Sequence, residues 1–184
     1  MAEHPLIFSA PMIRAILEGR KSVTRRMSKN PDYYTGWKKG DRVWVRETWG
    51  IGCRPDPHTG DRDGIEYRAD LEGLGENDDL PLYEVITPEH ICLGDYASGW
   101  KPSIHMPRWA SRITLELTAD VRQEPLHTMT EPEAKREGVE GGSQDEDGNS
   151  LWFRLGFAEL WDSMHPDHPW ISNPTVSVIE FSRI

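Results

Sequence analysis

The order of the elements that the sequence predicts is what most constrains the fold. Apolar and polar residues alternate over residues 113–118, which is typical of a half-buried strand. Helical spacing is confined to a few short segments, and strands and helices do not alternate regularly along the chain. A doubly wound parallel sheet needs that alternation, so we predict an α+β fold. The other predicted elements are helices at 11–19, 130–138 and 151–164 and strands at 42–49, 65–69 and 175–181, with weaker strand candidates at 83–86 and 91–93.

Capping residues mark where the helices begin and end. Ser9 is a suitable N-cap for the first helix, and Gly19 is a suitable stop at its C-terminal end. Thr130 and Glu133 have the spacing of a capping box, which predicts a short helix that ends near Gly138. Glu133 therefore has a structural role before any chemistry is considered. The apolar face of the last helix is predicted on Leu151, Leu155, Ala158 and Trp161.

A run of cationic and hydroxyl side chains directly follows the first helix. It holds Lys21 and Thr24 together with the guanidinium groups of Arg20, Arg25 and Arg26. A Thr hydroxyl is a poor nucleophile unless a base takes its proton. A Lys amine can be that base when burial or nearby cations lower its pKa, and the three arginines are such cations. The run thus offers a nucleophile, a base and anion-binding groups; the alternative interpretation is a solvated basic turn.

Three segments of the sequence resemble the ASCH domains of the PUA-like superfamily. They are the order Gly19, Lys21, Thr24, Arg26 after an amphipathic helix, the segment 40–49, which is similar to the first barrel strand of ASCH proteins, and the closing strand 176–181. The three in this order are more specific than any one alone, and the resemblance covers most of the chain. It implies a PUA-like mixed β pseudo-barrel flanked by short helices. We expect one such domain over 1–184, with an acidic insertion at about 54–80 and a polar loop at 141–149.

The resemblance also implies an activity. The chain looks like bacterial and phage-borne ASCH amidohydrolases, which remove the acyl group from the exocyclic amine of N4-acetylcytidine with a Lys, a Thr and a Glu. The Lys and the Thr correspond to Lys21 and Thr24 without a gap. The Glu corresponds more loosely to Glu137, and Glu133 is the competing candidate. Hydrolysis of this linear amide C–N bond requires no metal and no other cofactor.

A nucleobase pocket needs a flat apolar face and polar contacts at its edge. Trp49 and Trp109 lie beside charged residues and are candidates to stack on a pyrimidine. Packing in the core is the alternative for each. The predicted substrate-binding residues are Arg26, Arg46, Glu47, Trp49, His105 and Trp109. For His105, a packed loop histidine is the alternative. His165 and His168 have an i,i+3 spacing but no further ligands near them in the sequence, so we expect no metal site there.

The charge distribution bears on the kind of partner. The net charge of −10 opposes non-specific binding to a phosphate backbone. Residues 14–46 hold 10 basic and 3 acidic residues, whereas residues 56–95 hold 2 basic and 12 acidic ones. A basic patch among acidic surroundings suits a small nucleoside or nucleobase better than a long RNA. Two other functions stay open, an ASCH-type ribonuclease and a non-catalytic RNA-binding module.

The sequence also bears on the compartment. No apolar stretch approaches the roughly 20 residues that a membrane span needs. The first residues lack the basic region and apolar run of a secretory signal, and the two cysteines are far apart. We therefore expect a cytoplasmic protein that has no membrane partner.

Overall fold

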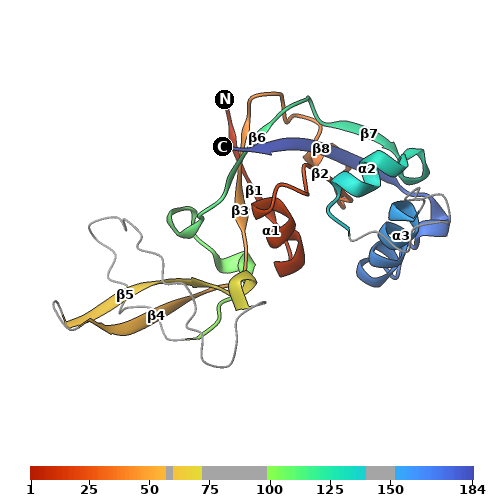
Figure 1. Ribbon diagram of the computed structural model, residues 1–184. Coiled ribbons are helices and arrows are strands. Elements are labelled where there is room, and N and C mark those ends of the chain that lie inside the picture. The colour runs from red at the N-terminus through yellow and green to blue at the C-terminus, as the bar shows by residue number, and fades with distance from the viewer. Residues whose placement is uncertain (57–59, 72–98, 140–151) are drawn as a thin grey trace. The chain divides into compact units, whose positions relative to one another are not determined.

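The computed structural model describes residues 1–56, 60–71, 99–139 and 152–184 (Figure 1). They form a mixed α+β fold of antiparallel strand pairs and few short helices, which confirms the predicted class. Two compact units are present. Unit 1 comprises Met1–Glu3, Ala15–Arg42 and Leu115–Ile184, and unit 2 comprises His4–Arg14 and Val43–Thr114. Among the described helices, none is long and apolar enough to cross a membrane.

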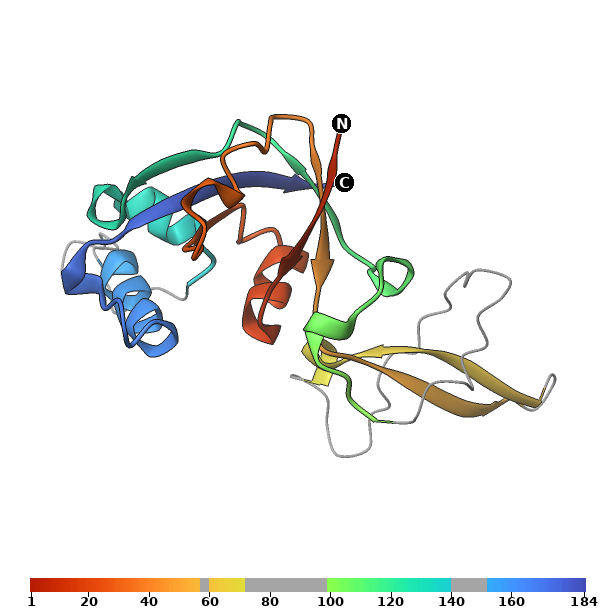
Figure 2. The same cartoon turned by 180° about the vertical axis from the view of Figure 1, so that it is seen from behind.

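Unit 1 is organised around its last strand, β8 (Thr175–Arg183). Strand β2 (Val23–Arg26) pairs antiparallel with β8, so that Thr24 lies opposite Ile179. Strands β6 (Thr114–Leu117) and β7 (Arg122–Pro125) pair antiparallel with other parts of β8. Figure 2 shows the same strands from behind. The strands expected at 113–118 and 175–181 are confirmed, but β7 was not expected, because its sequence is polar and has no apolar alternation.

Two helices pack on the sheet of unit 1, α2 (Glu131–Arg136) and α3 (Phe153–Met164). Their shared core consists of Val23, Leu126, Met129, Ala134, Phe157, Trp161, Val176 and Val178. The prediction that Leu155 faces this core is wrong, because its side chain is 49% exposed. Ala158 and Trp161, predicted on the same face, are buried as expected, and Leu151 lies outside the described residues. Phe157, one turn before Trp161, presents a larger aromatic area and takes the buried position instead of Leu155.

The segment that carries Lys21 follows α1 (Ala10–Leu17). The expected stop is confirmed: Gly19 has a φ of +76°, a left-handed conformation that glycine adopts without the steric cost of a side chain. The backbone N–H of Lys21 then donates to the carbonyl of Ala15 at 2.9 Å. That bond folds the chain back against the helix before β2 begins.

Unit 2 contains all but the first residue of β1 (Glu3–Ile7) and of β3 (Arg42–Arg46), and a hairpin of β4 (Trp49–Asp56) and β5 (Gly60–Tyr67). Its core consists of Trp49, Ile65, Tyr67, Met106 and Ala110. The strand expected at 42–49 is confirmed over 42–46, but its extension to 49 is wrong, since β3 ends at Arg46 and β4 begins at Trp49. The strand expected at 65–69 is only the end of β5. Periodicity missed this hairpin because positions such as Gly52, whose lack of a side chain leaves room for the side chain of Glu66, carry no apolar signal.

Short 3-10 turns complete the described chain, at Pro31–Tyr33, Arg68–Leu71, Ser103–His105, Arg108–Ala110, Leu126–Thr128 and Trp170–Ser172. The strand candidates at 83–86 and 91–93 and the polar loop at 141–149 lie outside the described residues. The PUA-like barrel and the single domain with an insertion at about 54–80 stay predictions.

Candidate functional site

Lys21 and Glu137 form a buried ion pair in unit 1. The Nζ atom of Lys21 donates to Oε2 of Glu137 at 2.7 Å and to the main-chain carbonyl of the same residue at 2.7 Å. The two side chains are 0% and 2% exposed, although the residues lie 116 positions apart in the sequence. Ionised groups are costly to bury unless they are paired and hydrogen-bonded, so each of these residues depends on the other.

A glycine allows the two residues to meet. Gly138 has a φ of +81°, and a Cβ atom at this position would lie 2.8 Å from the Cβ of Ala15 and 2.9 Å from the Cβ of Lys21. Any larger residue would push the end of α2 away from the Lys21 segment. Ser22 adds a main-chain link, because its N–H donates to the carbonyl of Arg136 at 2.9 Å.

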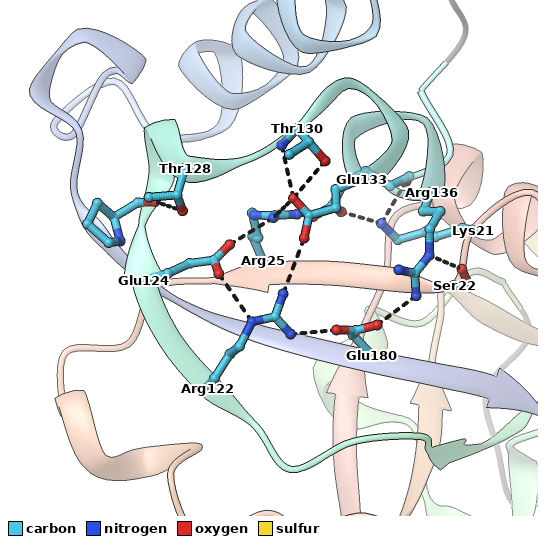
Figure 3. Close-up of polar contacts among 12 residues, drawn as sticks. Lys21, Ser22, Arg25, Arg122, Glu124, Thr128, Thr130, Glu133, Arg136 and Glu180 are labelled. Atoms are coloured by element: carbon cyan, nitrogen blue, oxygen red, sulfur yellow. Dashed lines mark hydrogen bonds and ion pairs between the residues drawn. The ribbon is translucent and has the colours of Figure 1, made fainter.

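Arg25 holds the other side of the Glu137 carboxylate. Its buried guanidinium lies 3.4 Å from Oε1 of Glu137. It also lies 2.9 Å from Glu124 and 3.3 Å from Glu133 (Figure 3). Glu133 also accepts a hydrogen bond from the main-chain N–H of Thr130, as the capping-box prediction requires, and a further one from the Thr130 hydroxyl. The sequence predicted only that Arg25 is a nearby cation, and it did not predict the contacts of Arg25 with three carboxylates.

The charged network extends to the surface through Arg122 and Arg136. Arg122 contacts Glu124 at 3.2 Å, Glu133 at 3.2 Å and Glu180. Arg136 contacts Glu180 at 2.8 Å. Together with the buried groups, the network has four cations, Lys21, Arg25, Arg122 and Arg136, and four carboxylates, Glu124, Glu133, Glu137 and Glu180. Its formal charge is therefore balanced.

Burial lowers the pKa of the Lys21 ammonium below its ordinary value of 10.5. Glu137 opposes this shift, while the charges of Arg26 and Arg25 add to it. The pKa of Lys21 is therefore lowered overall, which is the direction of shift that a catalytic base requires. For Glu133, burial acts to raise the pKa, but the hydrogen bonds from Thr130 and the charge of Arg25 outweigh it, so its pKa is lowered.

Thr24 and Arg26 lie on the face of β2 opposite to Val23 and Arg25, because successive residues of a strand point to opposite faces. Thr24 is buried, and its hydroxyl makes no hydrogen bond within the part of the chain that the structure describes. Arg26 is within electrostatic range of Glu137, and burial lowers the pKa of its guanidinium. The structure thus brings Lys21 and Glu137 into direct contact and leaves the Thr24 hydroxyl unengaged.

Two groups near Arg26 were not predicted as part of a substrate site. Tyr34 has its pKa raised by burial, with the charge of Arg26 opposing the shift. His165 has its pKa lowered by burial, by Arg26 and by His168. His165 also packs on Trp161, with ring centroids 4.2 Å apart.

Five predicted substrate-binding residues lie in unit 2. Glu47 is buried and accepts from Arg112 at 3.0 and 3.1 Å; its pKa is raised by burial, which Arg112 opposes. Arg112, which sequence reasoning missed, also donates to Asp70 and lies 4.0 Å from the Tyr67 ring centroid. Glu47 therefore has a structural partner, and a role in substrate binding stays a prediction.

The remaining members of this set differ in exposure. Trp49 is 1% exposed and packs edge-on against the half-buried Trp109 at 5.8 Å, which matches the core-packing alternative for Trp49. Arg46 lies 5.4 Å from the Trp44 ring centroid, and His105 is exposed in its 3-10 turn. Across the described ranges, no group of three or more His, Cys, Asp or Glu is placed to hold a metal ion.

Comparisons of the chain with protein-family models, with curated proteins and with solved structures find no match. The resemblance to ASCH domains therefore stays a prediction, and the case for a function rests on the geometry of the site.

Proposed function

We propose that unit 1 carries the active site of an amidohydrolase that removes the acyl group from N4-acylated cytosine or cytidine. The observation that carries the proposal is the buried Lys21–Glu137 pair, in which burial and two arginines lower the pKa of the amine. A lysine with a lowered pKa can exist as the neutral base that a hydroxyl nucleophile needs. The resemblance to ASCH amidohydrolases suggests the acylcytosine substrate, and the Lys21–Glu137 pair supports the hydrolysis of an amide.

Thr24 supplies the nucleophile in this proposal. Its Oγ1 attacks the acyl carbon while neutral Lys21 takes the hydroxyl proton. The C–N bond then breaks, and the cytosine amine leaves with the proton that Lys21 carried. Water attacks the resulting Thr24 ester, with Lys21 again taking and returning a proton, which releases the carboxylic acid and restores the hydroxyl.

Arg26 and Glu137 stabilise the charges that form during the proposed reaction. Arg26 lies on the same face of β2 as Thr24, which favours it as the group that stabilises the developing oxyanion. Glu137 stabilises the Lys21 ammonium that forms during attack. Since Lys21 and Thr24 are buried and Arg26 is only half-buried, we infer that the substrate enters from the Arg26 side.

A ribonuclease is less well supported, because the net charge of −10 opposes binding of the chain to a long phosphate backbone. The test is hydrolysis of N4-acetylcytidine by the parent, Lys21→Met and Lys39→Met. Lys39 is exposed and serves as the matched control. We expect Lys21→Met to lose about 10²- to 10⁴-fold in rate and Lys39→Met to match the parent. Absence of hydrolysis by the folded parent, or RNA degradation in its place, would overturn the proposal.

A further inference from the structure

A second feature of unit 1 lies outside the proposed reaction site. A cleft of about 670 Å³ is formed between the loop that carries Lys21 and the end of α2 that carries Glu137. Arg20 and Ser22 line it from the loop, and Lys135 and Arg136 line it from α2. The side chains of Lys21 and Glu137 do not line it. Its volume is that of sites for small organic molecules.

The lining of the cleft is cationic in a chain of net charge −10. Among the described residues that line it, three are cationic, Arg20, Lys135 and Arg136, and one is a carboxylate, Glu18. Arg136 also has Glu180 as an ion-pair partner outside the lining. The Arg20–Glu18 pair is solvent-exposed, with side chains 42% and 52% exposed. Such a pair contributes little to stability, so an incoming anion displaces Glu18 at low cost.

Arg136 is held in place before any ligand arrives. Its Nε donates to the Ser22 hydroxyl at 3.1 Å, and its Nη2 donates to Glu180 at 2.8 Å (Figure 3). Its Nη1 makes no hydrogen bond with the residues that the structure describes. A guanidinium fixed in this way presents a donor without further loss of side-chain entropy.

One wall of the cleft is apolar and anchored. Phe153 and Val139 are half-buried and pack against the core of unit 1. The Nζ of Lys135 lies 5.6 Å from the centroid of the Phe153 ring. The cleft therefore places a flat aromatic face directly beside a cation.

We propose that this cleft binds a small organic phosphate, with the phosphate among Arg20, Lys135 and Arg136 and a flat ring against Phe153. A phosphate monoester carries up to two negative charges near neutral pH, so the cations of the described lining attract it. Guanidinium groups bind phosphate through paired N–H donors. A phosphorylated aromatic molecule of mononucleotide size satisfies both the cationic and the apolar side of the cleft.

The test is calorimetric titration of the full chain with adenosine 5′-monophosphate, adenosine and inorganic phosphate, because cytidine is the product of the proposed hydrolysis and would also bind at the reaction site. We expect the monophosphate to bind at least about tenfold more tightly than either of the others, because only it fills both sides of the cleft. Equal affinity for inorganic phosphate would overturn the role of Phe153, and equal affinity for adenosine would overturn the role of the cations. No binding of the monophosphate would overturn the proposal.

Variants locate the binding and separate it from the proposed activity. Lys135→Gln and Arg20→Gln are each expected to weaken monophosphate binding about tenfold or more, whereas Lys39→Gln leaves it unchanged. Lys135→Gln is expected to hydrolyse N4-acetylcytidine as the parent does, because Lys135 has no part in the proposed reaction, so loss of binding without loss of hydrolysis separates the two sites. Unchanged binding by both Lys135→Gln and Arg20→Gln would place the ligand elsewhere, whatever the outcome of the hydrolysis assay.

Discussion

A Cβ atom at position 138 would lie 2.9 Å from the Cβ of Lys21, closer than side chains pack in folded proteins. Gly138 also has a left-handed backbone conformation. We therefore expect Gly138→Ala to destabilise the protein by at least about 1–2 kcal/mol from the backbone alone. The close contact adds to that cost and displaces Glu137, so hydrolysis of N4-acetylcytidine falls as well.

Urea denaturation measures the stability change, and Gly36→Ala is the control. Position 36 has no atom within 4 Å of an added Cβ, so its variant is expected within about 0.5 kcal/mol of the parent. A Gly138→Ala protein as stable and active as the parent would mean that the approach of α2 to Lys21 is not as close as described.

The second prediction concerns pH. The proposed base is neutral above its pKa, so kcat/KM is expected to rise with pH through the lowered pKa of Lys21 and to reach a plateau below pH 10.5. Arg25 and Arg26 contribute to that lowering. Arg25→Gln is therefore expected to move the rising limb to higher pH, whereas Arg25→Lys, which keeps the charge, moves it less.

The pH profile of kcat/KM separates this role of Arg25 from a purely structural one. Loss of packing alone lowers the plateau without moving the limb. A limb at the same pH in Arg25→Gln and in the parent would show that Arg25 does not act on Lys21. Thermal melts of both variants establish which of them remain folded.

The sequence predicts the local features of this site, but not the contacts between residues that lie far apart in the chain. Gly19 as a helix stop and the Thr130 capping box are local patterns, and both are confirmed. The contact between Lys21 and Glu137 spans 116 positions, and no periodicity encodes it; only the resemblance suggested that the two act together.

The contacts of Arg122 and Glu124 were missed for the same reason, because they depend on strand pairing and not on a local pattern. Arg122 and Glu124 share a face of β7, but that strand exists because its main chain pairs with β8, not because its side chains alternate. Without β7, nothing in the sequence brings Glu124 to Arg25. The hairpin of β4 and β5 was missed likewise, because its pairing depends on main-chain register and on small residues such as Gly52.

The third prediction separates two glutamates. Glu133 accepts from Thr130 at the start of α2 and contacts Arg25 and Arg122, so Glu133→Gln is expected to lower stability by about 0.5–2 kcal/mol while most activity remains. Glu137→Gln removes the charge that stabilises the Lys21 ammonium and is expected to lose most activity. The reverse result in the N4-acetylcytidine assay would exchange the two roles.

Acid titration of stability gives an independent measurement on Glu133. Its pKa is lower in the folded protein than its ordinary value of 4.5, so its contribution to stability is complete above about pH 4.5 and is lost as pH falls through the folded pKa. Glu133→Gln cannot titrate, and its stability is therefore expected to fall less steeply below pH 4.5 than that of the parent. Equal slopes would mean that Glu133 is not ionised in its contacts with Arg25 and Arg122.

The last prediction concerns the nucleophile. Thr24 is 2% exposed, and its hydroxyl makes no hydrogen bond among the described residues. Valine has the same shape and lacks the hydroxyl, so Thr24→Val is expected to fold and to be at least as stable as the parent. If Thr24 attacks the acyl carbon, this variant loses several orders of magnitude in rate, while Thr24→Ser keeps measurable activity.

The size of the loss in Thr24→Val distinguishes attack by Thr24 from attack by water. Were Lys21 to activate water directly, the hydroxyl would at most hydrogen-bond the substrate, and its removal would cost about 0.5–1.5 kcal/mol, or roughly tenfold in rate. Steady-state hydrolysis of N4-acetylcytidine by both variants, with thermal melts as the folding control, measures the difference. A folded Thr24→Val protein within tenfold of the parent would exclude the acyl-enzyme and leave Lys21 and Glu137 as a pair that activates water.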